Sequence, residues 1–147
     1  MYVFGGYSGG YKQDTHKLNL DTNAWSGEIS TTGTKPTGRY YHTSVLFGKF
    51  MVVFGGAGPG YTNDVHKLNL DTDTWSGALT TSGTAPTARK DSTSIVHGDY
   101  MFVFGGHDGT NGLDDLHKLD LTSNSWSGAI STTGTAPTAR RAHNSVV

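Results

Sequence analysis

A repeat of 50 residues is the feature that most restricts how this chain can fold. The run Met1-Tyr2-Val3-Phe4-Gly5-Gly6 returns at 51–56 and again at 101–106. Each copy is followed by a glycine-rich gap, an Asp-x-His-Lys-Leu run, a Trp-Ser-Gly, a segment with Thr, Gly and Pro, and an Arg. Repeats with a period of about 20–50 residues predict a solenoid, a propeller or a linear array. We therefore divide a single domain into repeats 1–50, 51–100 and 101–147.

The composition agrees with short strands joined by turns. Hydrophobic residues make up 34% of the 147 residues, Gly occurs 21 times, and no helical periodicity is present. A net charge of −1 with scattered Lys and Arg predicts neither nucleic acid nor a membrane surface as a partner. The chain has no Cys, and no segment is apolar enough for a transmembrane helix or a signal peptide, so we expect a cytoplasmic protein.

Each repeat predicts four short strands. In the first repeat the strands are expected at 1–4, 15–20, 24–30 and 39–46, with loops at 7–13 and 31–38. The first strand is an apolar run typical of a strand covered on both faces, and Gly5 and Gly6 are expected to end it. The second alternates, with His16, Leu18 and Leu20 on one face.

Four short antiparallel strands per repeat are typical of a propeller blade. The paired glycines after an apolar strand, the Trp that follows and the Pro-Thr-x-Arg segment resemble the kelch repeat in all three copies. One departure is His16, His66 and His117, where that family often has Tyr, and we interpret it as a tolerated exchange. The resemblance implies an all-β, kelch-type β-propeller with three four-stranded blades in this chain.

Three blades cover about half of a six-bladed ring, in which each blade takes roughly 60°. In the family's strand order, residues 140–147 form a first strand without the rest of its blade. A lone half ring would expose apolar faces and an unpaired strand edge. We therefore predict a homodimer in which residues 140–147 of each copy complete the first blade of the other. The alternative is an engineered or excised half-propeller whose only activity is self-assembly.

Two sets of long loops should share one face, because the strands that they join run in alternating directions. One set lies at 7–13, 57–63 and 107–114, and the other at 31–38, 81–88 and 132–139. The resemblance implies a scaffold, not an enzyme, that binds a protein or an acidic peptide on this face. Tyr and Arg are common anchors of such surfaces. The predicted partner-binding residues are Arg39, Arg89, Arg140, Tyr7, Tyr11, Tyr40, Tyr61, His107, Asp108 and Asn111, with Lys35, Lys90 and Arg141 near them.

The three recurring arginines allow two interpretations. An Asp also recurs on the same face, at positions 14, 64 and 115, so one interpretation is a structural ion pair within or between blades. The other is an arginine ring at the channel mouth that captures a carboxylate through bidentate hydrogen bonds.

Histidine and tryptophan also recur with the repeat, and neither predicts a cofactor. Packed sheets lie about 10 Å apart, too far for equivalent histidines to share a metal ion at about 2 Å. His42 and His143 lie on the strand nearest to the channel, and a metal or small-molecule site there is the enzyme alternative. No P-loop and no Ser/His/Asp nucleophile can be assigned. We expect the three tryptophans to be packing residues, at positions 25, 75 and 126.

Overall fold

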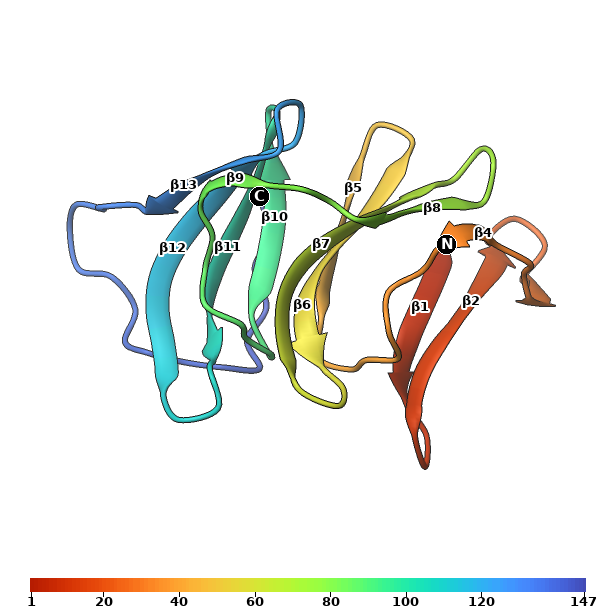
Figure 1. Ribbon diagram of the computed structural model, residues 1–147, viewed down its shortest axis with the longest axis horizontal. Coiled ribbons are helices and arrows are strands. Elements are labelled where there is room, and N and C mark those ends of the chain that lie inside the picture. Colours follow the sequence, from red (N-terminus) through yellow and green to blue (C-terminus); the bar gives the residue numbers. More distant parts are fainter.

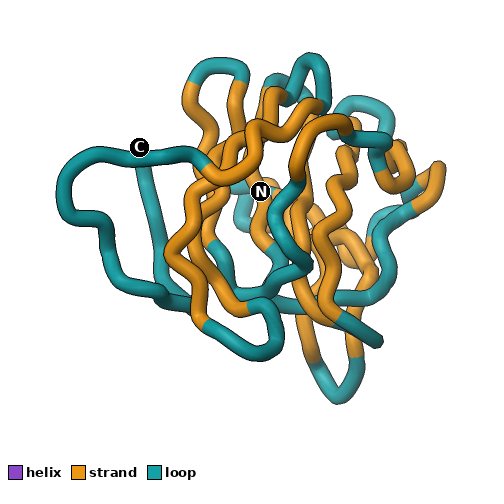
Figure 2. Tube along the Cα trace, turned by 60° about the vertical axis from the view of Figure 1, so that its left-hand side comes forward, coloured by secondary structure: helices purple, strands orange, loops and turns teal.

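The computed structural model describes residues 1–147 and contains thirteen β-strands and no helix (Figures 1 and 2). The first five strands are β1 Tyr2–Tyr7, β2 Tyr11–Asn19, β3 Ala24–Glu28, β4 Thr32–Thr34 and β5 Thr43–Phe47. The next four are β6 Phe50–Ala57, β7 Tyr61–Asn69, β8 Thr74–Ala78 and β9 Ser82–Thr84. The last four are β10 Thr93–His97, β11 Tyr100–His107, β12 Gly112–Asp120 and β13 Ser125–Ala129. The chain has no helix that could span a membrane.

The strands form three sheets that stand side by side as blades (Figure 1). Blade 1 consists of β1-β2-β3, blade 2 of β5-β6-β7-β8 and blade 3 of β10-β11-β12-β13, all with antiparallel neighbours. The short strand β4 adds in parallel to β8 on the outer edge of blade 2, and β9 adds in the same way to β13 of blade 3. The predicted all-β architecture of propeller blades is confirmed, although blade 1 has only three strands within this chain.

The paired glycines form a bulge inside the first strand, whereas the sequence predicted that they would end it. β1 continues to Tyr7, and its register against β2 shifts between Phe4 and Gly6. Gly5 and Gly6 have φ values of 66° and 104°, a backbone that glycine adopts at little cost. Because β2 also starts earlier than expected, at Tyr11, the predicted loop at 7–13 is reduced to residues 8–10.

The last predicted strand starts later than expected in the first two repeats and is absent from the third. In the first repeat it begins at Thr43 and not at Arg39, because Tyr41 has a left-handed backbone, with φ 56°, that interrupts the extended chain. The second repeat departs in the same way at Asp91, which also has φ 56°. Residues 140–147 form no strand, since the chain contains no strand next to them with which they could pair.

β4 and β9 lie in segments that the sequence predicted as loops. Gly33 explains how β4 reaches the next blade: a Cβ on this residue would overlap the carbonyl oxygen of Trp75 in β8. Gly83 has the same relation to Trp126 in β13. Glycine therefore lets the backbone of one repeat lie directly against the outer strand of the following blade.

Most of the hydrophobic core lies between the blades. Phe4 of blade 1 packs on Trp75 of blade 2, with ring centroids 4.9 Å apart, and Phe54 packs on Trp126 of blade 3 at 5.2 Å. Trp75 and Trp126 are buried, as expected for packing residues. Trp25 departs from that expectation within this chain, because no blade precedes β3, and 56% of its surface is exposed.

Replacing Gly33 with Ala should destabilise the fold by more than about 2 kcal/mol, because the new Cβ meets backbone atoms and the left-handed φ of 74° disfavours Ala. Gly27→Ala is the matched control, since Gly27 has a φ of 72° but no neighbouring atom within 4 Å of the place that a Cβ would take. This control should cost about 1 kcal/mol. Urea unfolding measures both losses, and equal values would contradict a stabilising contact between β4 and β8.

Candidate protein-binding face

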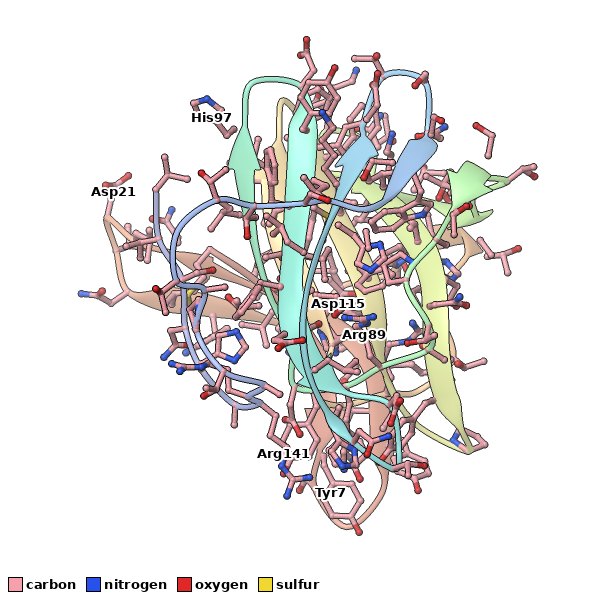
Figure 3. All side chains as sticks on the ribbon, turned by 90° about the vertical axis from the view of Figure 1, so that its left-hand side faces the viewer. Tyr7, Asp21, Arg89, His97, Asp115 and Arg141 are labelled. Atoms are coloured by element: carbon pink, nitrogen blue, oxygen red, sulfur yellow. The ribbon has the colours of Figure 1, made fainter.

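The connections on one side of the three blades lie at the same end of the molecule, at the bottom of Figure 1. The β1–β2, β6–β7 and β11–β12 loops lie there, together with the segments that lead from one blade to the next, as the strand directions predicted. Figure 3 places Tyr7 and Arg141 at this end, whereas Asp21 and His97 lie away from it. We call this surface the loop face.

Four tyrosines form an aromatic cluster on the loop face. The ring centroid of Tyr7 lies 5.9 Å from that of Tyr11 and 5.6 Å from that of Tyr40. Tyr11 stacks on Tyr40 at 5.7 Å, and Tyr40 contacts Tyr41 at 4.3 Å. Tyr7, Tyr11 and Tyr41 each expose 47–62% of their surface. This tyrosine cluster therefore presents several aromatic rings and hydroxyl groups to a partner.

Lys90 connects the tyrosine cluster with the second and third blades. Its Nζ lies 5.5 Å from the centroid of the Tyr41 ring and 5.2 Å from that of Tyr61, distances at which a cation is attracted to an aromatic face. Hydrogen bonding to Tyr61 raises the pKa of Lys90 and so keeps its amine charged. The His107 ring follows at 6.5 Å from Tyr61. A positive charge thus lies within a band of aromatic rings.

The structure brings half of the predicted partner-binding residues into this band: Tyr7, Tyr11, Tyr40, Tyr61 and His107. Asp108 and Asn111 shape the β11–β12 loop instead, because Asp108 Oδ1 accepts hydrogen bonds from the amides of Asn111 and Thr110. These bonds lower the pKa of Asp108. Tyr41 was not predicted. The available signal was that its position differs among the repeats, with Asp and Ala in the other two.

Arg39 and Arg89 were predicted as partner-binding residues, but both are buried between blades. Arg39 donates hydrogen bonds from its two Nη atoms to the Asp64 carboxylate, at 2.6 and 2.9 Å, and its side chain is 1% exposed. Arg89 and Asp115 form the same pair at 2.6 and 2.8 Å (Figure 3). The interpretation of these two arginines as members of structural ion pairs is therefore correct. The interpretation of them as part of an arginine ring open to ligands is wrong.

Each of these ion pairs joins one repeat to the next and is supported by a histidine. Burial alone would raise the pKa of Asp64, but hydrogen bonds with Arg39 and His66 outweigh it and hold this pKa well below its usual range. His66 Nε2 lies 2.9 Å from the Asp64 carboxylate. His117 stands in the same relation to Asp115, at 2.8 Å. These recurring histidines thus have a structural role next to the carboxylates.

The last recurring arginine and the first recurring aspartate do not form an arginine–aspartate pair in this chain. Arg140 is exposed, and its guanidinium donates hydrogen bonds only to Thr138. Asp14 contacts His16 alone, at 2.9 Å. Arg140 is therefore the one recurring arginine whose charge stays accessible. Lys35 lies apart from the tyrosine cluster, in a shallow pocket beside residues 28–31.

Backbone hydrogen bonds connect successive repeats at the loop face. The Asp91 amide donates to the Tyr41 carbonyl oxygen at 2.9 Å, and the Ala142 amide donates to the Asp91 carbonyl oxygen at 3.0 Å. All three residues have left-handed backbones with φ of 55–56°. Three different side chains thus share one backbone conformation, which the bonds between repeats stabilise.

His42 and His143 each pack against a phenylalanine. The ring centroids of His42 and Phe4 are 5.5 Å apart, and those of His143 and Phe104 are 5.4 Å apart. Burial, and then the charge of Arg39, lowers the pKa of His42 to about 4, so this ring is neutral at pH 7. The structure contains no group of three or more His, Asp or Glu side chains placed to hold a metal ion.

Comparison with protein-family models matches residues 1–147, the whole chain, to the family described as the KLHDC2/KLHL20/DRC7 Kelch-repeats domain. The match therefore includes all three blades, the loop face and the segment after β13. A comparison with curated proteins gave no match.

Replacing Arg39 with Ala should lower the free energy of unfolding by about 3–5 kcal/mol, because the Asp64 carboxylate loses its partner in a largely buried site. Lys49→Ala is the control, since Lys49 makes only an exposed contact of 3.6 Å with Asp71. Its removal should change the stability by less than about 0.5 kcal/mol. Chemical unfolding followed by tryptophan fluorescence measures both variants. A loss for Arg39→Ala as small as that of the control would rule out the structural role.

Proposed function

Because the chain belongs to the kelch-repeat family, we propose that it is a protein-binding propeller scaffold that completes its ring by self-assembly. The binding surface is the loop face. The tyrosine cluster carries this proposal, because exposed aromatic rings gathered on one surface are typical of protein recognition sites. They lie on strand ends and short connections, so little ordering is needed when a partner binds.

The chemistry of the loop face favours an acidic peptide segment with apolar or aromatic side chains. Lys90 offers a charge that a carboxylate can approach, and Arg141 adds a second cation at the same end of the blades. The surrounding tyrosines can pack on apolar groups and also form hydrogen bonds through their hydroxyls. With Arg39 and Arg89 buried, recognition of a carboxylate falls to these remaining cations.

Self-assembly accounts for the free ends of the blade series. β1 has no strand on its inner edge, and β3 has none on its outer edge. In blade 2 these two positions are filled by β5 and β4, and in blade 3 by β10 and β9. Unpaired edges of this kind favour pairing with another chain. Two copies would supply six blades, a number within the usual range for a closed propeller.

A peptide library displayed on phage tests binding to the loop face. Peptides selected on the protein should be acidic, and their affinity should fall about tenfold or more for Tyr7→Ser combined with Tyr11→Ser. Tyr100→Ser is the matched control, because Tyr100 is partly exposed and begins β11 at the opposite end of the blade. Equal binding to both variants would place the site elsewhere. A folded protein that selects no peptide would leave self-assembly as its only activity.

Solution mass tests the assembly. Light scattering after size exclusion should give the mass of two chains over a wide dilution series, because two half rings satisfy each other's free edges. A mass of one chain at all concentrations would contradict self-assembly, and so would a polydisperse mixture of larger species.

A further inference from the structure

The contact between successive blades has the same construction in both places where the chain contains it. A phenylalanine of one blade packs on a tryptophan of the next, as Phe4 does on Trp75 and Phe54 on Trp126. A short parallel strand from the earlier repeat covers the backbone of that tryptophan, in the register Thr32 to Thr74 and Gly33 to Trp75. An arginine of the earlier repeat binds an aspartate of the later one. We call this set of contacts the seam.

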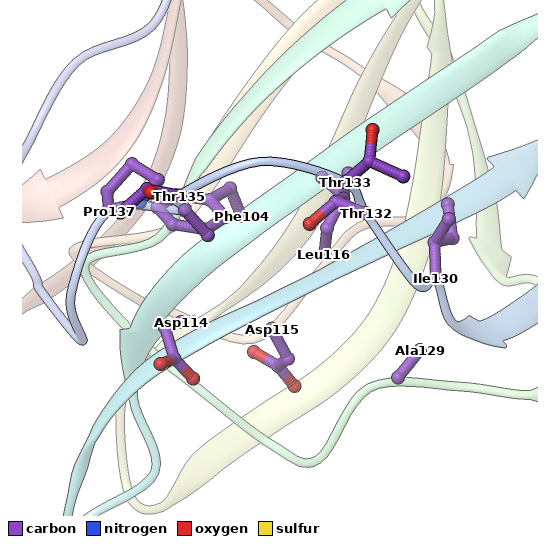
Figure 4. Close-up of a pocket in the computed structure, with 11 residues that line it drawn as sticks. Phe104, Asp114, Asp115, Leu116, Ala129, Ile130, Thr132, Thr133, Thr135 and Pro137 are labelled. Carbon is purple, nitrogen blue, oxygen red and sulfur yellow. The ribbon is translucent and has the colours of Figure 1, made fainter.

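On the open side of blade 3, the groups that an earlier repeat contributes to a seam are present, but no later repeat in this chain packs on them. A cleft of about 400 Å³ lies beside Phe104, between Leu116, Ile130 and Pro137 (Figure 4). The repeat places Phe104 where Phe54 stands in blade 2, next to the buried Trp126 ring. The cleft therefore occupies the position of an indole and has no tryptophan from this chain to fill it.

On the open side of blade 1, the groups that a later repeat contributes to a seam are present without a preceding blade to contact. Trp25 in β3 is 56% exposed, and the outer edge of β3 lacks the parallel strand that covers β8 and β13. At the other end of the chain, Gly134 keeps the left-handed backbone of Gly33, with φ 79°, but has no atom within 4 Å of a Cβ position. Gly134 therefore has the backbone conformation that lets Gly33 lie against a strand of the next blade, but no strand of this chain lies against it.

The polar groups of the two open sides are complementary as well. Arg140 lacks an aspartate, and Asp14 lacks an arginine, whereas the equivalent Arg39–Asp64 pair is formed at 2.6 Å. Lys17 and Asp73 form a further pair across a seam, at 2.7 Å. Lys118, the counterpart of Lys17 in the third repeat, bonds no residue of a following blade.

A second groove marks the absent inner strand of blade 1. It has about 400 Å³ and is lined by Tyr2, Val45, Leu46 and neighbouring residues. The segment 144–147 holds the repeat position of β5 and β10, and Ser145 Oγ already lies 2.7 Å from Thr93 Oγ1, as Ser94 lies near Thr43. The segment is therefore held where an inner strand would begin, with a free edge.

We infer that a second copy of this chain completes the seam: its Trp25 enters the cleft beside Phe104, and its Asp14 binds Arg140. Residues 133–135 then pair in parallel with residues 24–26 of the second copy, and its β1 accepts residues 144–147 as an inner strand. This inference rests on the self-assembly proposed above and assigns the residues that perform it. A second copy fits better than an unrelated partner, because each open side lacks the residue types that the other open side presents in the same register.

An engineered disulfide tests the register, and the chain has no native Cys to interfere. Ala24→Cys combined with Thr133→Cys should, on oxidation, give a covalent product of two chains on a non-reducing gel. Thr32→Cys combined with Thr74→Cys is the geometric control, because these residues pair directly in the seam within the chain, with hydroxyl oxygens 2.8 Å apart. The control should oxidise without a change in mass. Oxidation of the control alone would overturn the inferred register.

Removing the indole tests the cleft. Trp25→Ala should raise the dissociation constant of the dimer by about 100-fold or more, since a buried aromatic anchor is lost from each of two seams. The fold should persist, because Trp25 is exposed within a single chain. Lys49→Ala is the control, because Lys49 lies in the central blade and its side chain makes only an exposed contact of 3.6 Å with Asp71. This change should alter the constant less than about threefold.

The outcomes separate this inference from the proposed self-assembly. A wild-type protein that stays a single chain in solution contradicts the self-assembly, and this inference falls with it. A wild-type dimer that Trp25→Ala leaves intact, and that the paired cysteines do not link, keeps the self-assembly and overturns the seam. A dimer that is weakened by Trp25→Ala and linked through residues 24 and 133 supports both.

Discussion

The buried arginine–aspartate pair between successive repeats is the interaction on which the arrangement of the blades depends. The guanidinium of Arg39 contacts its own segment at Thr37, the bulge of β6 at Gly55 and the carboxylate of Asp64 in β7. It therefore fixes three segments that are distant in sequence, and Arg89 does the same one repeat later. A buried charge without its partner is costly, so the pair is satisfied only when the following blade stands in one register.

The contacts between blades combine residues of two successive sequence repeats, so the boundaries of the repeats do not coincide with those of the blades. We call this difference the offset. Every seam takes its phenylalanine, short parallel strand and arginine from one repeat, and its tryptophan and aspartate from the next. An open arc of three blades built in this way leaves its first and last groups unpaired, however well each blade is packed. The exposed Trp25 and the unpaired Arg140 are direct results of the offset. The central blade has contacts on both sides, and its strand β6 is buried without interruption from Met51 to Ala57.

The repeat period and strand alternation were sufficient to predict the blades, the shared loop face and four of its five tyrosines, all except Tyr41. They could not predict the glycine bulge, because Gly5 and Gly6 permit either a turn or a bulge, and the choice depends on the Gly6 amide bonding to the distant Arg39 carbonyl oxygen. β4 was hidden for the same reason, since its partner belongs to the next repeat. Arginine is a common residue on protein surfaces, so its burial at position 39 follows only from the offset that brings Asp64 to it.

The left-handed residue that each repeat places at the loop face separates backbone conformation from side-chain identity. A Tyr, an Asp and an Ala occupy this position with nearly the same φ, because the bonds to the neighbouring repeat decide the conformation. A substitution there changes the chemistry offered to a partner without a new backbone. The position therefore behaves like an interchangeable contact point, one per repeat, at which the specificity of the surface could be rewritten by single-residue changes while the ring that carries it is left unaltered.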